Sequence, residues 1–422
     1  MGQPLKVIIV GAGLSGLAIA QGLKKNGIDY VVVDKESEPR DRNWGVTIAW
    51  SHPFLQELLP KELFDRLAEC QPDIKLNSKE SGCESVMIRD GATGETIVEP
   101  PFPAVRRLNI QKTRTLWSKD VNVQFGKTVT NIELTSDGVI AHFQDGTSES
   151  GTVLVGADGG GSWVRRWLLG DEADARVLPY VFLNFPFKFT AERALKMDKM
   201  MHPIVDVGVH PKSMYIGIFL LDKPDLDRPE TWIFYILATW PKQQTSEDEY
   251  KDQNMADELR KRADGWADPF KSAVEWMPDD VKAKAVQLKI WSPISDWDNR
   301  DGRVTLAGDA AHSMTFRKYS SYHATEETSL TFWPIPDRGQ GANNAVKDSK
   351  MFVDAMIKVK SGKLSLVEAL GEYDKDVMTR GRQEVEISRV QTDAFHDHAR
   401  FLDSPVVKHG IRPSTEFSKA KE

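Results

Sequence analysis

The sequence predicts an α/β protein in which a helix-covered parallel sheet is interrupted by a second, mostly antiparallel sheet. Three observations predict this fold. A glycine-rich turn links the apolar run at residues 5–10 to a helical pattern and a second apolar run. Two later apolar runs, at residues 152–155 and 304–307, also lead into glycine and aspartate. Four further apolar runs lie between residues 177 and 242, and short runs of this kind are typical of buried strands.

The composition is that of an ordinary globular protein. The chain has 422 residues, with 55 Lys and Arg against 62 Asp and Glu and a formal net charge of −7. This length is sufficient for two or three domains, and the charge excludes a basic nucleic-acid-binding arm. Cys70 and Cys83 are the only cysteines, which indicates neither a disulfide framework nor a thiolate metal site and favours the reducing cytoplasm.

No transmembrane segment is expected. The longest uncharged stretch, residues 7–23, is broken by glycines and is shorter than the roughly 20 apolar residues that span a bilayer.

The first 34 residues predict one βαβ unit. Residues 5–10 form the first strand, and apolar residues at helical spacing then continue to the Asn-Gly pair at positions 26 and 27, where a helix would end. Residues 30–33 form the second strand, which ends at Asp34. Two parallel strands need such a helical crossover, and the crossover is right-handed.

The remaining elements follow from the spacing of apolar residues. Residues 51–70 predict a helix interrupted at Pro60, and residues 121–125, 132–134 and 139–143 predict short antiparallel strands. The inserted sheet takes the runs at residues 180–187, 205–209, 214–221 and 232–240. Further helices are expected at residues 255–276, 341–360 and 367–395.

The first glycine turn predicts a dinucleotide site. Gly11, Gly13 and Gly16 form the pattern Gly-x-Gly-x-x-Gly between a buried strand and a helix. These glycines permit a tight turn and close approach of the backbone to a pyrophosphate, and Asp34 can accept a hydrogen bond from a ribose hydroxyl. The alternative is a tight turn that binds nothing, and the pattern does not separate FAD from NAD.

Two later strands end in comparable motifs. Residues 155–159 read Val-Gly-Ala-Asp-Gly and contain Asp158 and Gly159, although a basic, solvated helix start is an alternative reading. Residues 303–312 contain Asp309, and Gly341 lies at the start of a later helix. The Asp309 carboxylate can accept from a ribityl hydroxyl, and a helix start at Gly341 can direct N–H groups at a flavin ring.

With these three motifs in this order, the sequence resembles the class A flavoprotein monooxygenases, the group of p-hydroxybenzoate hydroxylase and salicylate hydroxylase, and it looks closest to fungal members of aromatic or secondary metabolism. The resemblance runs from about residue 5 into the helices after Gly341. It implies a Rossmann-like FAD-binding domain of the glutathione-reductase type at residues 1–75, 104–176 and 293–365. A mostly antiparallel substrate domain takes residues 76–103 and 177–292, and a C-terminal helical segment takes residues 366–422.

The resemblance also implies roles for individual residues. Gly11, Gly13, Gly16 and Asp34 would hold the ADP half of FAD, although the family commonly has Glu where Asp34 stands. The Asp158–Gly159 motif would serve FAD and NAD(P)H together.

Further residues would lie beside the flavin itself. Asp309 and Gly341 would contact the ribityl chain and the flavin ring, and Gly45 belongs to a segment expected beside that ring. Either Arg106 or Arg107 would lie on the cofactor, and the sequence does not rank these two neighbours.

The implied activity is that of an FAD-dependent NAD(P)H monooxygenase. In the family, NADPH or NADH reduces FAD, O2 adds to the flavin to give a hydroperoxide, and one oxygen passes to an aromatic or polyketide-like substrate. No catalytic residue is assigned, and neither a metal nor a nucleic acid is expected as a partner; a homodimer is compatible with the sequence. The histidines at 396 and 398 would project from different faces of a helix.

Two alternatives stay open. The same fold could catalyse epoxidation or reduction, or the chain could be a flavin-binding product inactivated by an insertion between Asp309 and Gly341.

That insertion is the one segment that departs from the family pattern. Residues 317–336 add about 20 residues between His312 and Arg338, where the family has a short turn, and long structureless loops inside compact domains are uncommon. We hypothesise a retained intron, because Arg317 to Tyr319 can encode a GTAAGT splice donor and Pro336-Asp337 can encode a CAG acceptor. Excision would keep the reading frame; a functional lid loop is the alternative.

Sequencing of spliced transcripts tests this hypothesis. Spliced messages are expected to join Phe316 through a single histidine codon to Arg338, which restores the family spacing. If every transcript retains the interval, the intron hypothesis is wrong.

Overall fold

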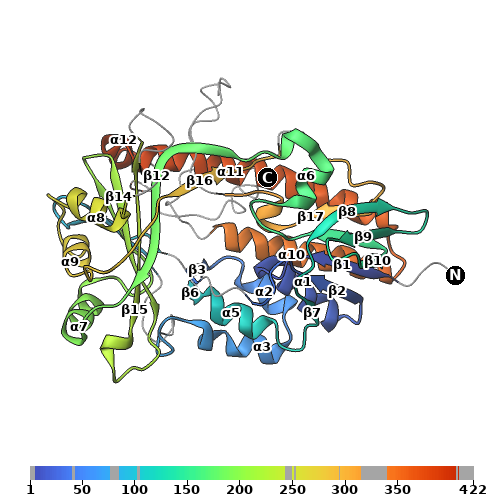
Figure 1. Cartoon of the computed structure of the whole chain (residues 1–422), viewed down its shortest axis with the longest axis horizontal. Coiled ribbons are helices and arrows are strands. Elements are labelled where there is room, and N and C mark those ends of the chain that lie inside the picture. Colours follow the sequence, from blue (N-terminus) through green and yellow to red (C-terminus); the bar gives the residue numbers. More distant parts are fainter. Residues whose placement is uncertain are drawn as a thin grey trace, which may run out of the picture.

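The computed structural model describes residues 5–39, 43–76, 85–101, 105–242, 250, 253–293, 295–314, 340–404 and 407. The chain forms two lobes (Figure 1), one built on a five-stranded sheet and the other on a seven-stranded sheet. The predicted insertion at residues 317–336 lies outside the described residues. No helix in the described ranges is long and apolar enough to cross a membrane.

The five-stranded sheet is parallel throughout. Its order is β17-β11-β1-β2-β7, with bounds Val304–Leu306, Val153–Gly156, Lys6–Val10, Asp29–Val33 and Val123–Gln124. The strands are buried runs of mainly β-branched and leucine residues, as expected for a sheet covered on both faces.

Three of these strands end at the same level. Val10 at the end of β1 is the partner of Gly156 on β11, and Gly156 is the partner of Leu306 on β17. The strand order changes direction at β1, because β2 lies on one side and β11 on the other. Loops leaving the carboxyl ends of parallel strands diverge at such a point and leave a crevice. The three predicted motifs therefore leave one edge of one sheet.

Helices cover one face of this sheet and a small antiparallel sheet packs beside it. Helices α1 (Leu14–Lys25) and α10 (Gln340–Lys360) pack closely together, since a Cβ at Gly22 would lie 2.8 Å from the Val353 side chain. The small sheet contains β8 (Val129–Leu134), β9 (Val139–Phe143) and β10 (Ser148–Gly151).

Shorter elements surround this core. They are β3 (Gly45–Ile48) paired with β6 (Arg106–Asn109), and the helical segments α2 (His52–Leu58), α3 (Lys61–Asp65), η1 (Arg66–Cys70), α5 (Ile110–Trp117), α6 (Trp163–Leu169), η2 (Gly170–Ala173) and η4 (Gly308–Ala310).

The seven-stranded sheet forms the second lobe. Its order is β16-β12-β15-β14-β13-β4-β5, with bounds Val286–Ile290, Arg176–Phe187, Ile233–Pro241, Met214–Asp222, Asp206–His210, Met87–Asp90 and Thr96–Val98. All neighbours are antiparallel except β4 and β13. Helices α7 (Ala191–Met200), α8 (Met255–Arg262) and α9 (Phe270–Glu275) cover the outer face, and η3 (Pro229–Thr231) precedes β15 (Figure 1).

Alternation along β12 separates the two faces of this sheet. Val181, Leu183 and Phe185 belong to the core shared with the outer helices. Phe182 and Asn184 point to the opposite face and line a cavity. Successive side chains on a strand point to opposite faces, so the sequence of β12 alone divides core from cavity.

Helix α11 (Leu366–Phe395) joins the two lobes and runs along the top of Figure 1. It starts with a capping box formed by Ser365 and Glu368, which satisfies free N–H groups of the first turn. Near its other end Asp393 accepts a hydrogen bond from the Tyr180 hydroxyl of β12, at 3.0 Å. The short helix α12 (His398–Leu402) follows directly.

Three expectations from the sequence are wrong. Residues 121–125 do not form an antiparallel strand: the chain enters β7 from helix α5, and this crossover places β7 parallel to β2. Residues 255–276 form two helices, since Gly265 has φ +83° and Pro269 has no N–H for a continuing helix. The histidines at 396 and 398 do not share a helix, because α11 ends at Phe395 and α12 begins at His398.

A buried carboxylate ties α11 to the parallel sheet and makes stability depend on pH. Asp374 accepts hydrogen bonds from the Thr305 hydroxyl of β17 and from Asn299 Nδ2 at 2.7 Å. Burial raises the pKa of the Asp374 carboxyl to about 6, against these hydrogen bonds, which lower it.

We expect Asp374→Asn to flatten the pH dependence of unfolding. Between about pH 4 and pH 6 the native Asp374 keeps a proton that the unfolded chain releases, so the wild type loses stability as pH rises, by roughly 3 kcal/mol in total. Denaturant unfolding at several pH values should show this loss in the wild type and in the exposed control Asp137→Asn. A variant with the wild-type slope would contradict the assignment.

Candidate active site

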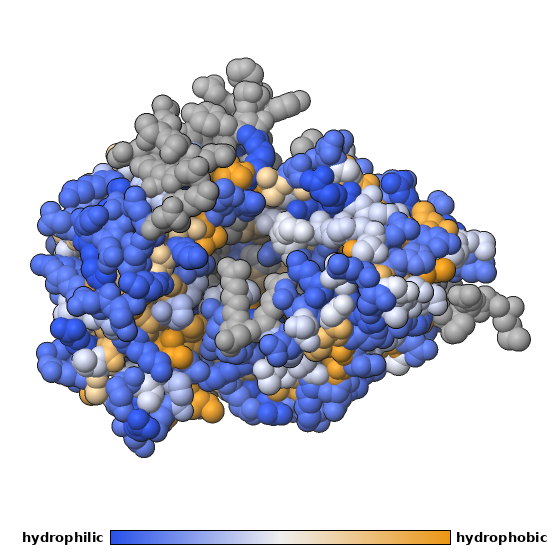
Figure 2. Space-filling view, viewed as in Figure 1, coloured by the Kyte–Doolittle hydropathy of each residue, from blue (hydrophilic) through white to orange (hydrophobic). Residues whose placement is uncertain are grey.

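A cavity of about 2020 Å³ lies at the carboxyl edge of the parallel sheet and extends to the inner face of the seven-stranded sheet. Figure 2 shows the surface hollowed between the two lobes. Most of the predicted site residues line this cavity: Gly11, Gly13, Asp34, Gly45, Arg107, Asp158, Gly159, Asp309 and Gly341. Gly16 and Arg106 do not line it.

The first glycine turn is built by close backbone contacts. Gly11 has φ +108°, and a Cβ there would lie 2.4 Å from the Ala157 carbonyl oxygen. Gly16 lies inside α1, where a Cβ would come within 1.9 Å of the Gly11 carbonyl oxygen. Gly16 therefore acts on the turn rather than on the cavity, because only glycine lets α1 pack so closely against it.

Gly13 differs from these two glycines. It precedes the first residue of α1, and a Cβ there would meet no atom within 4 Å because it would enter the cavity. The unpaired N–H groups of the first turn of α1 begin here, and such a helix start favours an anion.

Asp34 holds the same turn from the neighbouring strand. Its carboxylate accepts from the N–H of Ala12 at 2.7 Å and from the N–H of Glu36 at 3.0 Å. A carboxylate has about four acceptor positions, so Asp34 can also accept from a ligand hydroxyl in the cavity.

Asp158 uses its carboxylate to organise the second motif. It accepts from the Ser162 hydroxyl at 2.5 Å and from the N–H of Trp163 at 2.7 Å, and so caps α6. Burial raises the pKa of the Asp158 carboxyl, and these hydrogen bonds oppose the shift. Gly159 has φ +81°, which turns the chain along the cavity wall.

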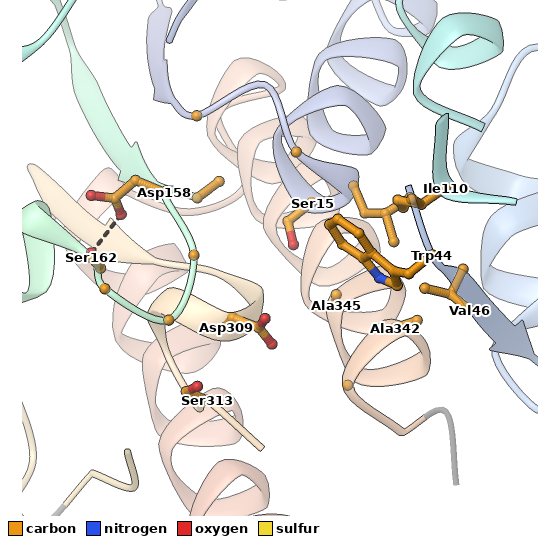
Figure 3. A pocket seen from close by; sticks show the side chains of 18 of the residues that line it. Ser15, Trp44, Val46, Ile110, Asp158, Ser162, Asp309, Ser313, Ala342 and Ala345 are labelled. Carbon is orange, nitrogen blue, oxygen red and sulfur yellow. Dashed lines mark hydrogen bonds between the residues drawn. The ribbon is translucent and has the colours of Figure 1, made fainter. Parts of the chain in front are cut away.

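Asp309 points into the cavity from the third motif. Figure 3 shows it on the same side as Asp158, across from Trp44, Val46 and Ile110. The side chain is exposed to the cavity. Desolvation by the surrounding protein raises the pKa of the Asp309 carboxyl, while the charges of His312 and Arg165 lower it.

Arg165 fixes the Asp309 turn from one side, although the sequence alone assigns it no role. Its guanidinium donates to the carbonyl oxygens of Ala310 at 3.0 Å and Gly160 at 2.5 Å, and lies 4.6 Å from the Trp291 ring centroid. Burial lowers its pKa to about 10, so Arg165 keeps its charge at neutral pH. It thereby joins the second motif to the third.

Asp348 of α10 fixes the same turn from the other side. Its fully buried carboxylate accepts from the N–H of Gly308 at 2.8 Å and lies 2.7 Å from His312 Nε2 and 2.6 Å from Arg380 Nη2. Burial alone would raise the pKa of Asp348, but the charges of His312 and Arg380 hold it well below its usual range. No sequence motif identified Asp348 or Arg380.

The two adjacent arginines separate on opposite faces of β6. Arg107 is 3% exposed and lines the cavity; its Nη1 donates to the Thr47 hydroxyl at 3.2 Å, and its guanidinium lies 4.3 Å from the Phe219 ring centroid. A Cβ at Gly45 would lie 2.6 Å from this guanidinium. Arg106 instead donates to Gln71 Oε1 at 2.8 Å, away from the cavity lining.

Helix α10 closes the cavity beside β3. Its first residues, including Gly341 and Ala342, line the cavity. Asn343 is fully buried and holds the β3 segment, because its Oδ1 accepts from the N–H of Ala49 at 2.9 Å and its Nδ2 donates to the Thr47 carbonyl at 2.9 Å.

The far end of the cavity has aromatic walls. Phe182, Phe219 and Tyr235 project from three strands of the seven-stranded sheet, and one face of α11 lies across from them with Glu384, Ile387, Ser388, Gln391 and Thr392. This end is large enough and apolar enough for a planar organic molecule.

Comparison with known proteins decides the family. The family model described as "FAD binding domain" matches residues 4–49 and 112–316. The FAD-dependent monooxygenase phnB of Penicillium herquei is 31% identical over 425 residues, which cover 99% of this chain and 97% of phnB. The chain belongs to this family of FAD-dependent monooxygenases.

Other relatives agree with this assignment. The FAD-dependent monooxygenase dbaB of Emericella nidulans is 34% identical over 82% of this chain and 85% of its own length. Among solved structures, Klebsiella pneumoniae HpxO complexed with FAD and uric acid has a TM-score of 0.70 and 23% identity, covering 99% of this chain and 95% of HpxO. The HpxO structure shares the fold of this monooxygenase.

The residues present fit FAD. The open space at Gly13 beside the start of α1 suits a pyrophosphate, Asp34 suits a ribose, and Asp309 suits a ribityl hydroxyl. In the described parts of the monooxygenase, no group of three or more His, Cys, Asp or Glu side chains is arranged to hold a metal ion.

Gly13→Ala tests this fit. The added methyl group meets no protein atom, so we expect the apoprotein to stay folded and to bind FAD roughly tenfold more weakly, measured by quenching of flavin fluorescence. The matched control is Gly371→Ala in α11, where a Cβ also meets nothing and which lies outside the cavity lining. Equal FAD affinity in both variants would place the pyrophosphate elsewhere.

Proposed function

We propose that this monooxygenase uses NAD(P)H and O2 to hydroxylate a small aromatic or polyketide-like molecule in fungal-type secondary metabolism. One observation carries the proposal: a single cavity has a nucleotide-type cradle at one end and aromatic walls at the other. The match to the FAD binding domain family and the whole-length similarity to fungal FAD-dependent monooxygenases support it.

The proposed FAD position follows the cavity lining. The ADP half would lie along Gly11, Gly13 and Asp34, with Gly16 holding the turn in shape. The ribityl chain would pass Asp309, and the flavin ring would lie between the start of α10 at Gly341 and the β3 segment.

The charges of the chain suit this position. The helix start at Gly341 directs a positive dipole end at the cavity, and Arg107 adds a buried positive charge near Gly45. Asp158 and Gly159 would border both FAD and NAD(P)H, as the second motif of the family implies. Arg106 has no part in this arrangement, because it contacts Gln71 instead.

Bound FAD supplies electron transfer and O2 activation, which the side chains of the protein cannot supply. The chain would contribute orientation and exclusion of water. The aromatic side chains of Phe182, Phe219 and Tyr235 would hold a planar substrate, and the surrounding lobes would shield the reacting atoms from water. We also place the enzyme in the cytoplasm, since a chain of this length with only two cysteines, Cys70 and Cys83, suits a reducing compartment.

Oxygen labelling tests the proposal. The purified protein should show a bound-flavin spectrum, and an accepted aromatic substrate should accelerate NADPH or NADH oxidation. Under labelled O2, mass spectrometry should find one labelled oxygen atom in the product and none from labelled water.

Three results would contradict the proposal. Absence of flavin from both the full chain and a version lacking residues 318–336 would remove the cofactor assignment. If the oxygen atom in the product came from water, the enzyme would not be acting as a monooxygenase. Substrate consumption without oxygen incorporation would favour the alternative reductase reading.

A further inference from the structure

We propose that Gln391 and Asn184 form a pair of amides that binds a carbonyl or phenolic oxygen of the aromatic substrate. The pair lies in the part of the cavity assigned to substrate, so the inference rests on the proposed function and adds the chemical group that the substrate must carry. It concerns binding and specificity, not the oxygen-transfer step.

Gln391 carries the strongest observation. Its side chain is 2% exposed and lines the cavity, and its Nε2 has no hydrogen-bond partner among the described residues. A buried N–H donor is unfavourable unless an acceptor meets it, so nearly all such groups in folded proteins are paired. An acceptor on a molecule in the cavity would satisfy this group.

Several polar groups near Gln391 on α11 are engaged within the protein. The Thr392 hydroxyl donates to the Ser388 carbonyl at 3.0 Å, and the Asp393 carboxylate accepts from the Tyr180 hydroxyl at 3.0 Å. His396 Nδ1 lies 2.8 Å from the Thr392 carbonyl oxygen. The Gln391 side chain, by contrast, lines the cavity and leaves its Nε2 unpaired among the described residues.

Asn184 supplies a second amide to the cavity from β12. It is half-buried on the cavity face of β12, between Phe182 and Pro186, which also line the cavity. Its backbone pairs with Leu237 of β15, and its side-chain amide makes no hydrogen bond with the part of the chain that the structure describes. An amide in this position can donate to one ligand oxygen and accept from another.

The surrounding side chains define the class of ligand. Phe182, Tyr235 and Leu237 give flat apolar walls, and Ile387 adds an apolar surface from α11. The two amides are neutral hydrogen-bonding groups, so they suit a ketone, quinone or phenolic oxygen. The expected ligand is therefore a fused or substituted aromatic ring that carries such an oxygen.

A matched pair of probes tests the inference on the FAD-loaded protein. Acetonaphthone offers a ketone oxygen, and isopropylnaphthalene has nearly the same shape without it. Binding is measured as the change in flavin absorbance during titration, so turnover is not needed. We expect the wild type to prefer the ketone by about tenfold, as one hydrogen bond in a desolvated site can provide.

Substitutions at the two amides should remove that preference. Gln391→Leu is expected to bind the ketone about tenfold more weakly and the hydrocarbon equally well, and Asn184→Leu should act in the same direction. Gln391→Glu replaces the donor with an acceptor and should also lose the ketone. Gln144→Leu makes the same chemical change at an exposed position and should behave as the wild type.

The outcomes separate the inference from the proposed function. Failure to bind FAD would overturn the proposed function. If FAD binds but the wild type binds neither probe, or binds both equally, the assigned ligand class is wrong. If the wild type prefers the ketone and both leucine variants keep that preference, the amide pair is not the site.

Discussion

The buried carboxylate of Asp348 is the constraint on which the proposed site depends. The carboxylate accepts a hydrogen bond from the Gly308 N–H and contacts the side chains of His312 and Arg380. This one group of α10 therefore fixes the turn that carries Asp309, and it also holds α11 through Arg380. Removing one partner from a buried ion pair costs about 3–5 kcal/mol, because the other charge is left unpaired. The turn has little freedom, since Arg165 holds its carbonyl groups from the other side.

The same geometry explains why three distant motifs act together. Strands β1, β11 and β17 end in register, so the turns that begin at residues 11, 157 and 307 leave the same edge of the sheet. The strand order reverses at β1, and the crevice opens between the turns at this point. Helix α11 then carries this frame to the second lobe. Its first half binds β17 through Asp374, and its second half forms a wall of the substrate end of the cavity.

The sequence predicts local order better than the contacts that complete the site. The parallel strands and the first glycine turn follow from short apolar runs and from the spacing of Gly11, Gly13 and Gly16. Asp348, Arg165 and Gln391 could not be selected in this way. Asp348 acts on Gly308, 40 positions away, Arg165 acts on Ala310, 145 positions away, and Gln391 lines a cavity. Arg106 and Arg107 could be separated only by knowing which face of β6 meets the cavity.

The FAD affinity of Asp348→Asn tests the central claim most directly. Asparagine keeps the shape of the side chain but removes the charge that holds Arg380 and His312, so the Asp309 turn should loosen. In samples with wild-type circular dichroism, titration with FAD should give at least about tenfold weaker binding, equal to roughly 1.4 kcal/mol. A folded variant that binds FAD as tightly as the wild type would contradict the claim that Asp348 holds the cofactor site in shape.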